Sequence, residues 1–114
     1  MNLYETVFIS RQDLSTADAE ALGEKFAESI KELGGKVAKK EYWGLRSLAY
    51  KINKSKKGHY TLINFEGKPD SIKELERRFR LNEDIVRSIV LRVDEFSKEP
   101  SVILRDDSDD KYAA

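Results

Sequence analysis

The chain has 114 residues, with 21 basic and 21 acidic side chains and a formal net charge of zero at pH 7. That length suits one domain with a single core. The chain has no cysteine, which excludes a disulfide framework and a thiolate metal site and fits a reducing compartment. No apolar run approaches the ~20 residues that span a bilayer, and the N-terminus lacks the charged-then-apolar pattern of a secretory signal. We therefore expect a cytoplasmic protein with no membrane partner.

The charges are unevenly distributed along the chain. Between Lys36 and Tyr60 there are eight basic residues against one acidic residue, Glu41, whereas the first 35 residues hold seven acids and three bases. The segment from Asp94 onward has that same acidic excess. Local blocks matter more than the net charge because the Debye length at physiological salt is only ~8 Å. The basic block favours a polyanionic partner such as RNA over a merely solvated surface.

The first elements expected are a strand and a helix. Residues 3–9 are rich in β-branched and aromatic side chains and predict a strand. Ser15 is an expected helix N-cap, with Asp18 in the first turn where an acid suits the helix dipole, and Gly34-Gly35 ends the helix. The apolar stripe expected to be buried consists of Ala19, Leu22, Phe26, Ile30 and Leu33.

A long hairpin follows. Residues 37–53 predict an extended strand that bends near Gly44, and residues 59–65 predict the strand that pairs with it. The lysine-rich segment 54–58 is expected to be the turn between them.

The last elements complete one domain. Pro69 begins a second helix, whose apolar residues Ile72, Leu75 and Phe79 have helical spacing, and residues 85–93 predict a fourth strand. The order β-α-β-β-α-β predicts an α+β, ferredoxin-like sandwich: a four-stranded antiparallel sheet with two helices on one face. We expect this domain over residues 1–94, followed by a mixed-charge, flexible tail over residues 95–114.

The expected strands carry large apolar side chains on both faces, although the helices cover only one. Scattered apolar residues on a surface are ordinary. A cluster that spans several strands instead indicates a surface covered by a partner protein. The residues expected on this partner face are Val7, Ile9, Tyr60, Leu62, Ile89 and Leu91.

Catalytic and metal-binding residues are not expected. His59 is the only histidine, so neither a histidine-based metal site nor a Ser-His-Asp triad has more than one candidate. We expect His59 at a strand edge, and we expect no catalytic residue, metal, cofactor or small-molecule substrate.

The residues also match a known family. Residues 44–52 follow a pattern of glycine, any residue, a basic residue, any residue, then Leu-Ala-Tyr-x-Ile, and Tyr4-Glu5 and residues 79–92 match the same family's opening and last strand. From Met1 to about Val93 the chain resembles the bacterial small-subunit ribosomal protein six family. Lys51 stands where that family often has proline.

The resemblance implies a ferredoxin-like fold and a structural role without enzymatic activity. It also implies that the chain forms a heterodimer with small-subunit ribosomal protein eighteen. The heterodimer is expected to bind the central domain of the small-subunit ribosomal RNA. Some members of the family also bind the leader of their own messenger RNA.

Long cationic side chains neutralise phosphates, and an exposed aromatic ring stacks on an unpaired base. Trp43 offers such a ring, but it is more often a packing residue. The arginines of the second helix have an alternative role in ion pairs with acids of that helix. The residues expected to bind RNA are Arg46, Tyr50, Lys54, Lys56, Arg80, Arg87 and Arg92.

Two other functions use this fold. Small acyl-phosphate hydrolases cradle phosphate with an arginine after the first strand, where Arg11 stands, but the segment lacks glycines and Asp13 would repel phosphate. A single-strand RNA-recognition module stacks bases on aromatics of the third strand. Residues 57–65 begin like its motif but have His59, Thr61 and Asn64 where aromatics are needed.

Overall fold

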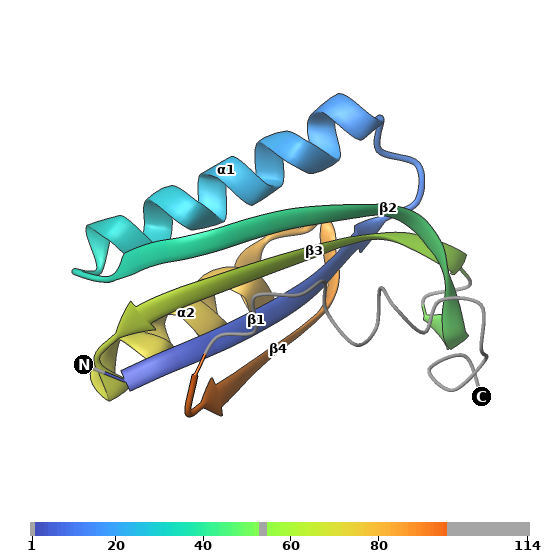
Figure 1. The fold of residues 1–114 in the computed structure, drawn as a ribbon. Coiled ribbons are helices and arrows are strands. Elements are labelled where there is room, and N and C mark those ends of the chain that lie inside the picture. The colour runs from blue at the N-terminus through green and yellow to red at the C-terminus, as the bar shows by residue number, and fades with distance from the viewer. Residues whose placement is uncertain (1, 53–54, 96–114) are drawn as a thin grey trace.

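The structure is a computed structural model that describes residues 2–52 and 55–95, without the side chains of residues 47–52 and 55–56. Its elements alternate in the expected β-α-β-β-α-β order, and the ferredoxin-like fold is confirmed (Figure 1). The elements are β1 (Asn2–Arg11), α1 (Thr16–Glu32), β2 (Lys36–Ile52), β3 (Ser55–Gly67), α2 (Pro69–Leu81) and β4 (Ile85–Val93).

The four strands form one antiparallel sheet in the order β2-β3-β1-β4, so β1 and β3 are central and β2 and β4 are edges. Both helices pack on the same face of this sheet (Figure 1). We name the opposite face the outer face. No helix in the described ranges is long and apolar enough to cross a membrane.

Three phenylalanine rings tie the helices to the sheet. The ring centroid of Phe8 in β1 lies 5.3 Å from that of Phe26 in α1 and 5.2 Å from that of Phe79 in α2. The rings of Phe26 and Phe79 stack at 4.3 Å, within the range of favourable aromatic pairs. The expected helical stripes therefore do form the core. Its other buried members are Tyr4, Leu22, Ala27, Ile30, Ile63, Phe65 and Leu75.

The helix boundaries follow the expected capping residues. The side-chain oxygen of Ser15 accepts a hydrogen bond from the Asp18 amide at 3.0 Å, and Gly34 follows the helix with a φ of 86°, a conformation that glycine adopts without steric cost. Pro69 occupies the first turn of α2, where its missing N–H is not needed.

The hairpin differs from its expected form. The bend at Gly44 is confirmed, with a φ of 88° and a register shift between Tyr42 and Gly44. The expected turn over residues 54–58 is wrong, because β3 already begins at Ser55, which pairs with Ile52. Gly58 pairs with strands on both sides, so backbone hydrogen bonding prevails over the turn preference of the Lys-Lys-Gly sequence.

His59 is also placed differently. The expectation of a strand-edge position is wrong, because His59 lies in the central strand β3 and is only 3% exposed. It shares the helix-facing side of that strand with Ile63 and Phe65 of the core.

Candidate partner and nucleic-acid interface

The outer face brings together side chains from all four strands. The register places Val7 of β1 between Leu62 of β3 and Ile89 of β4. In the same way, Ile9 lies between Tyr60 and Arg87. All the residues expected on the partner face lie on this one side of the sheet, since strand residues two apart share a face. Their contact with a partner stays a prediction.

The exposed part of this apolar surface is on the edge strand β4. Ile89 is 47% exposed and Leu91 is 49% exposed. Leu62 in central strand β3 lies on the same face but has no exposed surface. Exposed large apolar side chains side by side on a sheet edge indicate a contact surface, so a partner's contact with this face would centre on β4.

A row of polar side chains interrupts the apolar surface on β1, β2 and β3. Glu5 lies opposite Asn64, and Asn64 lies opposite Lys39. The Lys39 ammonium lies 4.0 Å from the Glu41 carboxylate, which also accepts a hydrogen bond from the Trp43 indole at 3.3 Å. Burial raises the pKa of Glu5; the Lys39 charge opposes that shift and the Glu41 charge adds to it. Our sequence interpretation missed this row, although a glutamate among apolar strand residues was a visible signal.

Two arginines from opposite edges of the sheet approach Tyr60. Trp43 is 7% exposed and stacks on Tyr60 with ring centroids 6.2 Å apart, so Trp43 packs within the chain. The Arg46 guanidinium donates to the Trp43 carbonyl at 3.2 Å. Burial raises the pKa of Tyr60, while the positive charges of Arg87 and Arg46 oppose that shift. One end of the outer face is therefore both aromatic and cationic.

Two of the other expected RNA-binding residues, Arg80 and Arg92, lie away from this cationic end. Arg92 pairs with Tyr4 and lies on the opposite side of β4 from Arg87. Arg80 is an exposed residue of α2, in the helix layer. The side chains of Tyr50, Lys54 and Lys56 lie outside the described residues.

Arg77 and Arg78, which precede Arg80 in α2, form the ion pairs that were the alternative to RNA binding for the arginines of this helix. Arg77 and Arg78 both contact Glu74, at 3.3 and 3.1 Å, and Arg78 also reaches Glu32 of α1 at 3.3 Å. These exposed pairs lie in the helix layer, away from the outer face, and each is worth little to the fold.

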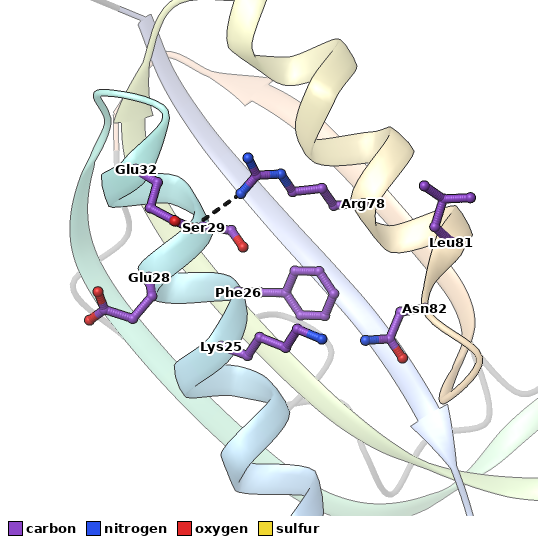
Figure 2. Close-up of a pocket in the computed structure, with 8 residues that line it drawn as sticks. All are labelled: Lys25, Phe26, Glu28, Ser29, Glu32, Arg78, Leu81 and Asn82. Carbon is purple, nitrogen blue, oxygen red and sulfur yellow. Dashed lines mark hydrogen bonds and ion pairs between the residues drawn. The ribbon is translucent and has the colours of Figure 1, made fainter.

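A groove of about 520 Å³ runs between α1 and α2 on the helix layer (Figure 2). The Phe26 ring lies in it, and the ion pair between Arg78 and Glu32 joins its two walls. Its only hydroxyl is that of Ser29, and its lining contains no histidine or cysteine. The groove therefore lacks the paired nucleophile and base of a hydrolytic site. Its lining residues are Lys25, Phe26, Glu28, Ser29, Glu32, Arg78, Leu81 and Asn82.

The arginine of the acyl-phosphate alternative is already engaged. Arg11 contacts Asp13 at 2.5 Å and Asp84 at 3.5 Å. The Asp13 hydrogen bond and charge raise the pKa of Arg11, and that hydrogen bond holds the pKa of Asp13 below its usual value. Two carboxylates thus engage the arginine that would have to hold the phosphate. In the described part of the chain, no group of three or more His, Cys, Asp or Glu side chains is arranged to hold a metal.

The RNA-recognition alternative requires several aromatic rings on the outer face of β3. This strand instead presents Tyr60, Leu62 and Asn64 to that face, as the pairing with β1 shows. A single aromatic ring does not make the platform on which successive bases stack.

A family model described as "Ribosomal protein S6" matches residues 3–92. The chain belongs to the ribosomal protein S6 family. The small ribosomal subunit protein bS6 of Gluconacetobacter diazotrophicus is 52% identical over 111 residues, covering 97% of this chain and 69% of that protein. That of Maricaulis maris is 54% identical over 104 residues, covering 91% and 89%.

A solved structure supports the same assignment. The 30S ribosomal protein S6 of Thermotoga maritima is 33% identical and superposes with a TM-score of 0.77, covering 81% of this chain and 87% of that one. Proteins of this family are structural components of the small ribosomal subunit in the cytoplasm, and the family resemblance seen in the sequence is confirmed.

Proposed function

We propose that this chain binds the central domain of the small-subunit ribosomal RNA as a heterodimer with small-subunit ribosomal protein eighteen. The observation that carries the proposal is the composition of the outer face. Half-exposed Ile89 and Leu91 lie on the same face as Arg46 and Arg87, which flank Tyr60. One face thus combines an apolar surface for a protein with cations for a phosphate backbone.

The apolar part is the protein-binding part of the proposed interface. Val7, Ile89 and Leu91 are neighbours on β1 and β4, and covering them removes apolar surface from water, which is the main driving force of protein association. Ile9, Tyr60 and Leu62 support them from the two central strands.

The cationic end is the RNA-binding part. A guanidinium grips a phosphate with two parallel hydrogen bonds, and Arg46 and Arg87 approach from different strands. Tyr50, Lys54 and Lys56 follow Arg46 closely in the sequence, and the proposal includes them among the RNA-binding residues. Arg80 and Arg92 lie on other surfaces and would contact separate RNA segments.

The chain has no net charge, so we expect it to bind RNA weakly alone and strongly with its partner. The test is to titrate a central-domain rRNA fragment with this chain, with protein eighteen, and with both, at one fixed salt concentration. Equal affinity with and without protein eighteen would contradict the proposal. Tight binding of short single strands by this chain alone would instead favour the RNA-recognition alternative.

A further inference from the structure

The polar row on the outer face contains more negative than positive charge. The side chains of Glu5 and Glu41 are two carboxylates, and Lys39 is the cation whose charge acts on Glu5 and whose ammonium lies 4.0 Å from Glu41. The Lys39 ammonium therefore interacts with both carboxylates, those of Glu5 and Glu41. Burial is the largest influence on the pKa of the Glu5 carboxylate, and it outweighs the charge of Lys39.

The neighbouring amide is also incompletely paired. Asn64, opposite Glu5 on β3, is 1% exposed, and its side-chain oxygen has no hydrogen-bond donor. Buried polar atoms are nearly always hydrogen-bonded in folded proteins. The row thus combines a half-buried carboxylate with a buried amide oxygen that lacks a donor.

The raised pKa of Glu5 predicts that the free chain is less stable at neutral pH than at acidic pH. This pKa is raised because burial disfavours the charged form, so the folded chain binds a proton at Glu5 more readily than the unfolded chain does. The stabilising effect of this raised pKa is complete below the unfolded pKa and disappears as the pH rises through the folded pKa. A half-buried charge whose burial outweighs the neighbouring cation is difficult to explain by folding alone.

We propose that the protein partner of the outer face places a basic side chain against the Glu5 carboxylate. This inference rests on the proposed function, because it requires that a protein covers this face. The added cation would balance the second carboxylate of the row, while the adjacent Val7 and Leu91 supply apolar contact on the same face. Arginine suits the position best, because its fork has N–H groups for the Glu5 carboxylate and further donors for its surroundings.

The test is the variant Glu5→Gln, which keeps the shape of the side chain and removes its charge. We expect Glu5→Gln to weaken the heterodimer with protein eighteen by about tenfold or more, since it leaves the partner's cation covered and unpaired. The matched control is Glu20→Gln, an exposed glutamate on α1 in the helix layer. This control should bind as the unaltered chain does.

Two further measurements separate a binding role from a structural one. Urea unfolding of the free chain at pH 7 should show Glu5→Gln to be at least as stable as the unaltered chain, because the variant removes a desolvated charge. The affinity of the unaltered chain for protein eighteen should fall as the pH drops through the raised pKa of Glu5, because the partner's cation favours the ionised form. Glu5→Gln should lack this part of the pH dependence.

The outcomes are distinguishable. If the unaltered chain does not bind protein eighteen, the proposed function fails and this inference fails with it. If the unaltered chain binds and Glu5→Gln binds equally tightly with the same pH profile, only this inference is overturned. A Glu5→Gln variant that is clearly less stable in urea would show that Glu5 serves the fold, and it would overturn the inference too.

Discussion

The Tyr42 hydroxyl lies 2.7 Å from Nδ1 of His59. The other ring nitrogen, Nε2, lies 2.8 Å from the Leu14 carbonyl oxygen, which only accepts hydrogen bonds. Nε2 therefore donates its proton to Leu14, and in the neutral ring Nδ1 accepts the hydrogen bond from Tyr42. This chain of two hydrogen bonds fastens the loop after β1 to β3 and β2.

Replacing Tyr42 with phenylalanine should lower the free energy of unfolding by about 1–3 kcal/mol, because it leaves the buried Nδ1 of His59 without a donor. Urea denaturation at pH 7 measures the change. Tyr60→Phe is the matched control: burial and the charges of Arg87 and Arg46, and not a hydrogen bond, account for the pKa shift of Tyr60, so this change should cost much less. Equal losses in the two variants would contradict the role assigned to His59.

Aspartate substitutions on the outer face should have different effects at Ile89 and Leu62. Ile89→Asp should leave the free chain folded, because this side chain is half exposed, and should abolish the heterodimer with protein eighteen, because it buries an unpaired carboxylate under the partner. Leu62→Asp should unfold the chain itself, because Leu62 is fully buried. Circular dichroism checks folding, and titration with protein eighteen checks binding. A folded Ile89→Asp variant that still forms the heterodimer would show that the partner binds elsewhere.

Removing the two arginines beside Tyr60 should alter the salt dependence of RNA binding. The double variant Arg46→Ala with Arg87→Ala should weaken rRNA binding by the preformed heterodimer and flatten the log–log salt slope by roughly 0.7 to 0.9 per lost phosphate contact. Arg77→Ala is the control, since Arg77 pairs with Glu74 in the helix layer. An unchanged slope in the double variant would place the RNA surface away from Tyr60.

Two glycines should differ in their tolerance of alanine. Gly44 has a positive φ, but a Cβ atom there would meet no atom within 4 Å, so Gly44→Ala should cost about 1 kcal/mol of backbone strain. A Cβ atom on Gly35 would lie 2.7 Å from the Glu66 carbonyl oxygen and 2.8 Å from the Ile30 side chain. Gly35→Ala should therefore lose more stability in urea unfolding. A larger loss of stability in Gly44→Ala than in Gly35→Ala would contradict this expectation. It would show that the positive φ at Gly44 matters more to stability than the close contacts around Gly35.

Local sequence patterns were sufficient to predict most of the fold. The spacing of Leu22, Phe26 and Ile30 predicted the buried side of α1, and the run from Ile85 to Val93 gave the bounds of β4. Each signal depends on a few neighbouring residues, which is why it is visible without tertiary structure. The hairpin turn and His59 were misplaced because their positions depend on hydrogen bonding from both sides of β3.

The candidate site was only partly predictable. Strand alternation separated the two faces of each strand, but the register of β1 with β3 and β4 is what places Val7, Leu62 and Ile89 on one face. The approach of Arg46 and Arg87 to Tyr60 depends on the strand order β2-β3-β1-β4, which brings together residues far apart in the sequence. The two carboxylates that share Lys39 are likewise visible only when β1 and β2 are known to flank β3.

The stack of Trp43 on Tyr60 gives the outer face a built-in optical reporter. Trp43 is the only tryptophan of the chain, so indole emission comes from this one place, next to the expected sites of both protein and RNA contact. Changes in its intensity or wavelength would follow assembly on the outer face in real time, without an attached dye.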